Sequence, residues 1–209
     1  MGGIGGLGGL GGVPGVMGGL AYPGFIVVDL FDGSSADAAG RAPNQNTAGG
    51  TWSYSGGATW SVNGSGVLVP AGTIAGNDDE IYINVGTPNQ DIRGTFNIAV
   101  NDIVVLMGRR TSALTQMLLV AFQSSQTLTM YSVKEGEADE AVATSAATIP
   151  ASTNFTMRFT LNSSNLCKGY VNDLEILSVT VAESTNANFA GLECQQTTNQ
   201  FLEFRVAQF

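Results

Sequence analysis

The sequence of 209 residues contains no histidine, and only 12% of the residues are charged. The absence of histidine excludes Ser-His-Asp and Cys-His catalysis, metal sites with imidazole ligands and a histidine-based pH switch. The charged fraction is about half of the usual ~25%. Solubility must therefore come from serine, threonine, asparagine and glutamine side chains.

Positive charge is especially scarce. The chain has 8 basic and 17 acidic residues, which gives a formal net charge of -9. A negative molecule is repelled by phosphate backbones and by anionic lipid surfaces, so we expect neither a nucleic-acid nor a membrane partner. The sequence also lacks a run of about 18 apolar residues and the basic start of a secretory signal, so we expect no membrane span and no general export signal.

Cysteine is nearly absent. Cys167 and Cys194 are too few for a zinc site and allow one disulfide or none. The acidic residues gather in two predicted turns, where they read as solvated loops, although carboxylates in such loops could also bind calcium. These residues are Asp78, Asp79 and Glu80 in one turn and Glu135, Glu137, Asp139 and Glu140 in the other. We expect no metal and no cofactor.

Glycine, in contrast, is abundant, with 28 residues. In residues 1–20 it occupies every third position, at Gly3, Gly6, Gly9, Gly12, Gly15 and Gly18. An extended helix with three residues per turn would place one apolar edge between these glycines, formed by Ile4, Leu7, Leu10, Val13 and Val16. The pattern predicts that residues 1–22 form an anchor arm that becomes ordered on a partner surface. A flexible glycine-rich linker is the alternative.

The remaining residues, 23–209, form a series of short β-rich runs separated by Gly, Asn, Asp and Ser. No segment has a convincing helical pattern, so the runs predict an all-β domain. The expected strands are Phe25–Phe31, Thr51–Tyr54, Ala58–Val62, Val67–Pro70, Glu80–Val85, Ile92–Val100, Ile103–Arg110, Gln116–Gln123, Thr127–Lys134, Ala141–Ile149, Phe155–Asn162, Leu166–Val171, Leu174–Val181, Ala190–Cys194 and Phe201–Val206.

The spacing of apolar residues indicates how these strands pack. In Phe155–Leu161 every second residue is apolar, while Thr156, Arg158 and Thr160 point to the opposite face. The run Met117–Phe122 is apolar throughout, as expected for a central strand covered on both faces. Two antiparallel sheets stacked as a sandwich fit these patterns better than a small barrel does.

Several segments carry a family resemblance. They are Val28–Gly33, Gly50–Trp52, Trp60–Val62, Val105–Arg109, Leu128–Gly136, Gly169–Asp173, Ala190–Leu192 and Phe201–Val206. Their order resembles the concanavalin A-like or laminin G-like jelly-roll sandwich found in phage virion proteins and bacterial glycan-binding modules. The resemblance implies a jelly roll over residues 25–209. Hydrolases of this fold resemble one another in a Glu-x-Asp-x-x-Glu run, which is missing here, so we expect no enzyme.

Two groups of side chains could form a binding site. Trp52, Tyr54 and Trp60 lie in one predicted hairpin, where they would either stack on a sugar ring or pack in the core. Arg109 and Arg110 could bind an anionic group, although at least one would be expected to pair with a carboxylate.

The apolar arm, the low charge and the all-β body together favour a structural protein of a phage virion. We expect a head decoration, head fibre or tail appendage, anchored by its arm in the virion and projecting the sandwich outward. Its partners would be other virion proteins and further copies of the chain, most readily as a homotrimer, with host-surface glycans as a further option. The alternative is a carbohydrate-binding module that acts through Trp52, Tyr54 and Trp60.

Replacing Leu7, Leu10 and Val13 with serine tests the arm. Each buried apolar side chain contributes about 1 kcal/mol or more, so the triple variant should lose oligomer mass and incorporation into particles. Light scattering and particle analysis measure these two quantities. If neither changes, the arm is only a linker.

Overall fold

A computed structural model describes residues 24–34, 36–71, 79–111, 115–181, 186–195 and 197–209. The predicted arm, with its five anchor residues, lies outside the described residues. The first strand begins at Phe25, close to the expected domain boundary. The described part of the chain contains no helix, and therefore none that could cross a membrane.

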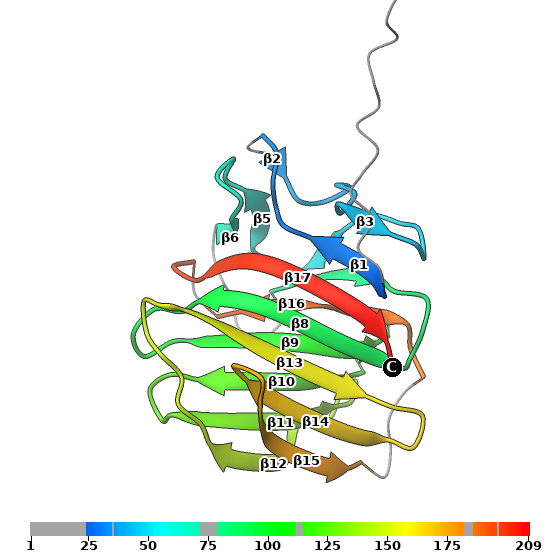
Figure 1. The fold of residues 1–209 in the computed structure, drawn as a ribbon, viewed down its shortest axis with the longest axis vertical. Coiled ribbons are helices and arrows are strands. Elements are labelled where there is room, and N and C mark those ends of the chain that lie inside the picture. Colours follow the sequence, from blue (N-terminus) through cyan, green and yellow to red (C-terminus); the bar gives the residue numbers. More distant parts are fainter. Residues whose placement is uncertain (1–23, 35, 72–78, 112–114, 182–185, 196) are drawn as a thin grey trace, which may run out of the picture.

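Two antiparallel sheets stack face to face, which confirms the predicted sandwich (Figure 1). The larger sheet has ten strands and the order β15-β14-β13-β8-β17-β6-β5-β2, with β1 paired to β17 and β3 paired to β1. Its strands are β1 (Phe25–Asp29), β2 (Ala36–Asp37), β3 (Gln45–Asn46), β5 (Thr59–Val62), β6 (Leu68–Ala71), β8 (Gln90–Asn97), β13 (Asn154–Leu161), β14 (Leu166–Val171), β15 (Leu174–Thr180) and β17 (Gln200–Gln208).

The smaller sheet has seven strands in the order β12-β11-β10-β9-β16-β7-β4. These are β4 (Ser53–Ser55), β7 (Glu80–Asn84), β9 (Ile103–Arg110), β10 (Gln116–Phe122), β11 (Thr127–Val133), β12 (Glu140–Ala146) and β16 (Phe189–Cys194). Every run predicted from the sequence overlaps one of the strands, with differences of a few residues at the ends. No predicted run covers β2 or β3, because two residues are too few to show a period.

The main core lies between the sheets and contains most of the large apolar side chains. Aromatic rings form part of it. The ring centroid of Phe201 lies 5.3 Å from that of Trp60 and 5.5 Å from that of Phe96, both in edge-on geometry. Such pairs add stabilisation beyond the burial of their area. The alternating apolar residues of β13 reach the same core, as their spacing predicts.

Strand β10 is apolar on both faces because it contributes to two clusters. Met117, Leu119 and Ala121 face the main core, whereas Leu118 and Val120 lie on the outer side of the seven-stranded sheet. There they form a second cluster with Val105 and Met107 of β9. The expectation that this strand is covered on both faces is confirmed.

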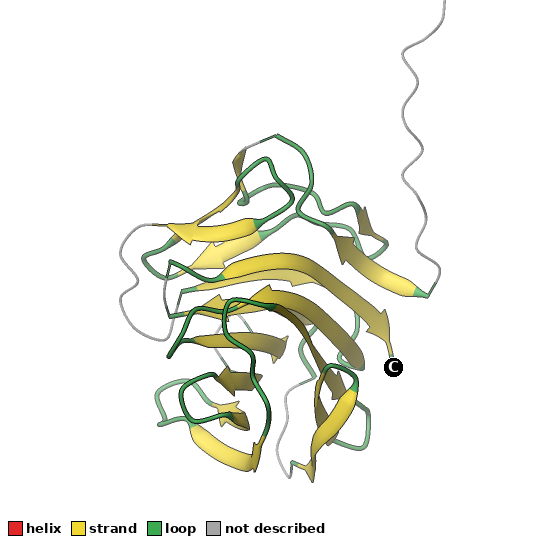
Figure 2. Cartoon of the chain, turned by 60° about the vertical axis from the view of Figure 1, so that its left-hand side comes forward, coloured by secondary structure: helices red, strands yellow, loops and turns green. Residues whose placement is uncertain are grey.

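Loops join the strands at both ends of the sandwich (Figure 2). The turn between β14 and β15 consists of Asn172 and Asp173, whose φ angles are 48° and 63°. Two consecutive residues with positive φ are typical of the two-residue hairpin turn that suits the twist of antiparallel strands. Asparagine and aspartate tolerate this conformation better than most residues, which explains their use here.

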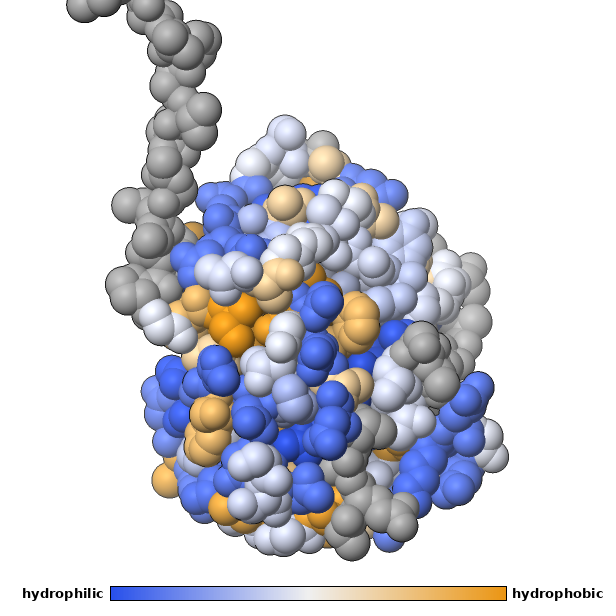
Figure 3. All heavy atoms as spheres, turned by 90° about the vertical axis from the view of Figure 1, so that its right-hand side faces the viewer, coloured by the Kyte–Doolittle hydropathy of each residue, from blue (hydrophilic) through white to orange (hydrophobic). Residues whose placement is uncertain are grey.

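The surface is polar without being highly charged. On the side where β17 ends, hydrophilic residues and residues of intermediate hydropathy surround a smaller group of apolar ones (Figure 3). The sequence as a whole has few charged residues, at 12%.

The close packing of β16 against β7 gives a stability prediction. A Cβ atom at Gly191 would lie 2.1 Å from the carbonyl oxygen of Ile81, which is backbone and cannot turn away. We expect Gly191→Ala to lower the free energy of unfolding by about 3 kcal/mol or to prevent folding. At Gly169 a Cβ would meet the flexible ends of Leu119 and Leu128, so Gly169→Ala should cost about 1 kcal/mol. Urea unfolding compares the two, and equal losses would contradict this packing.

Candidate functional site

The two tryptophans predicted as glycan contacts lie in the core. Trp52 is 1% exposed and Trp60 is 0% exposed, so neither ring has a free face for a sugar. The indole N–H of Trp52 donates to the buried carboxylate of Asp29 at 2.7 Å. Half-buried Tyr54 packs against the same core. Of the two interpretations of these tryptophans, the glycan platform is wrong and core packing is correct. Burying such large rings removes more apolar surface from water than leaving them exposed would.

The predicted hairpin around these residues is also wrong. Strand β4, next to Trp52, pairs with β7 in the seven-stranded sheet. Strand β5, which contains Trp60, pairs with β6 in the ten-stranded sheet. The chain thus changes sheets between the two segments.

The first acidic turn is buried instead of solvated, which is a second correction. Asp79 and Glu80 are each 1% exposed. Asp79 accepts hydrogen bonds from the backbone N–H groups of Gly57 and Ala58 at 2.5 and 2.7 Å. Glu80 accepts from Arg110 at 2.6 Å and forms an ion pair with it. These carboxylates fasten loops and strands together, while Asp78 lies outside the described residues.

The second acidic group follows the prediction, since Glu135, Glu137, Asp139 and Glu140 are all exposed.

Arg109 and Arg110 have a structural role. Arg110 pairs with Glu80, as expected for at least one of the two arginines. The buried guanidinium of Arg109 donates to the carbonyl oxygens of Pro88 and Asn162 and to the side chain of Asn165. Burial lowers the pKa of Arg109, and its hydrogen bonds tie β9 to two loops.

Cys167 and Cys194 are both buried and form no disulfide with each other. Cys167 lies on β14 and Cys194 on β16, which belong to different sheets. Burial raises the pKa of Cys167 to about 11, against a smaller opposing effect of Arg109, so this thiol is unreactive at neutral pH.

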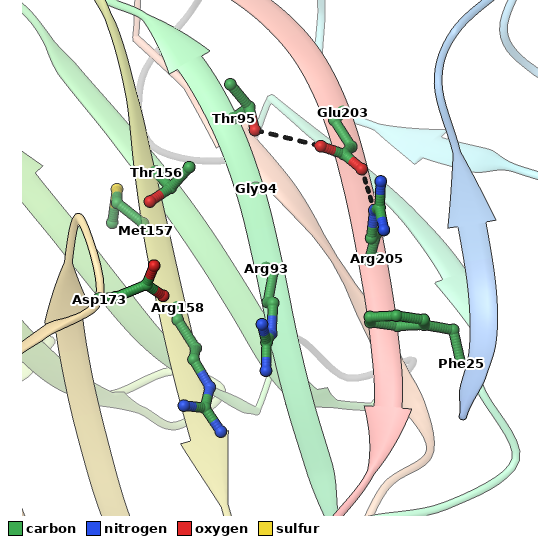
Figure 4. A pocket seen from close by; sticks show the side chains of 10 residues that line it. All are labelled: Phe25, Arg93, Gly94, Thr95, Thr156, Met157, Arg158, Asp173, Glu203 and Arg205. Atoms are coloured by element: carbon green, nitrogen blue, oxygen red, sulfur yellow. Dashed lines mark hydrogen bonds and ion pairs between the residues drawn. The ribbon is translucent and has the colours of Figure 1, made fainter. Parts of the chain in front are cut away.

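A different region has the character of a binding site. The face of the ten-stranded sheet that points away from the core has a depression of about 180 Å³ across β13, β8 and β17 (Figure 4). We call this region the polar face. The depression is lined by Phe25, Arg93, Gly94, Thr95, Thr156, Met157, Arg158, Asp173, Glu203 and Arg205.

Three arginines form a row across this polar face. Arg93 on β8 lies directly opposite Arg158 on β13 and directly opposite Arg205 on β17. Figure 4 shows Arg93 on the strand between the other two. Since neighbouring strands are about 4.8 Å apart, the three residues start from points spread over about 10 Å. Like charges directly opposite one another destabilise a sheet, so the row needs compensation.

Asp91 supplies part of that compensation. Arg158 donates to both carboxylate oxygens of Asp91 at 2.8 Å, and Arg93 donates to the same oxygens at 3.1 and 3.4 Å. Burial would raise the pKa of Asp91, but the hydrogen bonds and charges of Arg158 and Arg93 outweigh it and lower the pKa. The carboxylate therefore stays ionised, and the bidentate bond to Arg158 is the stronger of its two pairings.

Aromatic rings lie at both ends of the row. The guanidinium carbon of Arg158 is 4.9 Å from the ring centroid of Tyr170. The guanidinium carbon of Arg205 is 5.3 Å from the ring centroid of Phe25, and Arg205 also pairs with Glu203. Stacking and ion pairing hold these two guanidinium groups in fixed orientations.

The polar face continues beyond Tyr170 onto β15. Lys168 forms an ion pair with Glu175 at 2.9 Å, and the hydroxyl of Tyr170 donates to the same carboxylate at 3.2 Å. Four of the 8 basic residues of the chain, Arg93, Arg158, Lys168 and Arg205, thus lie on this single face. In a protein of net charge -9 this is a marked concentration.

A second hollow, of about 230 Å³, lies over the seven-stranded sheet. Its floor consists largely of the apolar side chains of the second cluster, including Val105, Leu118 and Val120. It offers fewer hydrogen-bonding groups to a polar ligand than the polar face does. We therefore take the polar face as the candidate site.

The sequence analysis placed Arg158 on the outer face of its strand but did not connect it with Arg93 and Arg205. Alternation alone would have put each arginine on a polar face, because each stands next to apolar residues that point inward. What the sequence does not show is the order in which β13, β8 and β17 pair.

The pairing of Asp91 gives a further stability prediction. Arg93→Gln relieves like-charge repulsion and leaves the bidentate pair intact, so the free energy of unfolding should change by less than about 0.5 kcal/mol. Asp91→Asn leaves the arginines poorly compensated and should cost about 2 kcal/mol. This cost should be full above about pH 4 and disappear as the pH falls through the lowered pKa of Asp91. Unfolding curves from pH 2 to 7 measure it, and equal effects of the two variants would contradict the assigned pairing.

Neither a protein-family model nor a curated protein matches the chain. Solved structures do. The carbohydrate-binding module CBM66 from Bacillus subtilis is similar with a TM-score of 0.53 and 12% identity, over 88% of this chain and 97% of that one. A Bacillus subtilis protein of unknown function with a galectin-like fold has a TM-score of 0.55 and 14% identity, over 85% of this chain and 97% of that one.

The exoplasmic/lumenal domain of VIP36, in a form bound to Ca²⁺ and Man3GlcNAc, has a TM-score of 0.52 and 9% identity. That match covers 76% of this chain and 84% of that one. At such identities the likeness concerns the fold. It confirms the jelly-roll sandwich that the sequence resemblance implied, in the form shared by galectin-like and carbohydrate-binding domains.

Proposed function

We propose that the protein is a carbohydrate-binding module whose ligand lies on the polar face of the ten-stranded sheet. The observation that carries the proposal is the depression across β13, β8 and β17, into which three arginines, two threonines and two carboxylates project. Binding sites for small ligands are concave and hold a few convergent polar groups.

The chemistry of this face suits a sugar. Guanidinium groups donate to hydroxyl and ring oxygens, while the carboxylate of Glu203 and the hydroxyls of Thr95 and Thr156 can accept from sugar hydroxyls. The rings of Phe25 and Tyr170, on which Arg205 and Arg158 stack, flank the arginine row and hold these two guanidinium groups toward a ligand. The sheet holds these groups on rigid elements, which limits the entropy lost on binding.

The similar structures support the same function. Two of them are described as a carbohydrate-binding module and as a glycan-bound lumenal domain. Since one fold hosts many functions, their likeness adds weight only because this chain has a suitable site of its own. The proposal keeps the carbohydrate-binding alternative of the sequence analysis and moves its site from the buried tryptophans to the polar face.

Screening the chain against an array of neutral and acidic glycans tests the proposal. We expect binding by the wild type and a loss of at least about tenfold in the double variant Arg93→Ala/Thr156→Ala, since both side chains project into the depression. The control is Trp52→Phe, which removes a buried hydrogen bond and should lower stability by about 2 kcal/mol without changing glycan affinity at a temperature where it is folded.

Two outcomes test the function and the site separately. Failure of the wild-type chain to bind any glycan on the array would contradict the proposed function. Binding that is weakened by Trp52→Phe but not by the double variant would contradict the proposed site.

The virion role, the homotrimer and the absence of catalysis stay predictions. No observation on the described residues bears on the arm or on assembly. The similar structures support glycan recognition and give no support to a place in a virion.

A further inference from the structure

We propose that the ligand on the polar face carries a carboxylate, so that the bound glycan contains an acidic sugar held by Arg93 with Arg158 and Arg205 beside it. This inference rests on the proposed function and narrows it to one class of saccharide.

The depression differs in charge from the rest of the molecule. Its lining holds three guanidinium groups and the two carboxylates of Asp173 and Glu203, and Asp91 adds a third carboxylate that pairs with Arg93 and Arg158. These ionic groups balance, whereas the whole chain has a net charge of -9. An acidic ligand therefore meets exposed guanidinium groups at a place that lacks the excess negative charge of the rest of the molecule. This contrast favours a ligand with an isolated negative charge over a dense polyanion, which the remaining surface would repel.

The three arginines are not equally committed to partners within the protein. Arg158 holds Asp91 with two bonds of 2.8 Å and stacks on Tyr170. Arg205 pairs with Glu203 and stacks on Phe25.

Arg93, in the centre, shares Asp91 with Arg158 through the longer contacts of 3.1 and 3.4 Å. Its side chain is 42% exposed, the most of the three. Arg93 is therefore the guanidinium best able to take an external partner.

A carboxylate is the partner that fits this arrangement. Guanidinium and carboxylate groups are both planar and form two parallel hydrogen bonds, as Arg158 and Asp91 already do within this face. A carboxylate bound to Arg93 would also offset the repulsion among three cations aligned on adjacent strands. A neutral sugar hydroxyl would add nothing to the compensation that Asp91 and Glu203 already give.

The test uses two matched pairs of probes: tri-galacturonate with its methyl ester, and sialyllactose with lactose. Within each pair the sugar rings are shared and the carboxylate is present in one member only. Titration calorimetry should show at least about tenfold tighter binding of the acid in one or both pairs. That preference should weaken as ionic strength rises, because the site is partly exposed.

Two variants locate the effect. Arg93→Gln should remove most of the preference for the acid while leaving the fold intact. Lys134→Gln removes the same charge from a position outside the polar face and should leave the preference unchanged. If both variants reduce binding of the acid equally, the effect is one of overall charge and the inference is wrong.

The remaining outcomes distinguish this inference from the proposed function. If acids and neutral partners bind equally, or if sulfated lactose binds and both carboxylated probes do not, the carboxylate assignment is overturned while glycan binding stands. If none of these probes and no glycan on the array binds, both fall.

Discussion

The pairing of β8 with β13 on one side and β17 on the other is the constraint on which the rest of the molecule depends. Its register turns Ile92 and Phe96 into the core and places Arg93 on the outer face between two further arginines. Side chains alternate between the faces of a strand, so a slip of one residue would bury the arginines and expose the core. The same hydrogen bonds that build the sandwich thus assemble the candidate site.

The polar groups of the sandwich differ in burial between the core and the polar face. The buried carboxylates of Asp29 and Glu80 accept from Trp52 and Arg110 and fasten segments that lie far apart in the sequence. On the polar face the arginines stay partly exposed, and the buried carboxylate of Asp91 compensates the repulsion between Arg93 and Arg158 without covering them. Asp91 thus stabilises the sheet, while Arg93 remains accessible, as the proposed ligand site requires.

Much of the fold could be predicted from the sequence, because alternation along a strand and a turn such as Asn172-Asp173 are local signals. The site could not. Alternation puts Arg158 on a polar face, but its alignment with Arg93 and Arg205 depends on pairing between distant strands, which no local pattern encodes. Of the two interpretations offered for Trp52 and Trp60, core packing is confirmed and the glycan platform is wrong. The expected hairpin around them is wrong for a related reason, because the chain changes sheets between the two segments.

A crystal structure of the protein with a bound acidic oligosaccharide would test the central claim most directly. The account predicts a saccharide lying across β13, β8 and β17, with its carboxylate bonded to Arg93 through two parallel hydrogen bonds. A saccharide bound over the seven-stranded sheet, or at the loops with the arginine row still facing solvent, would contradict it.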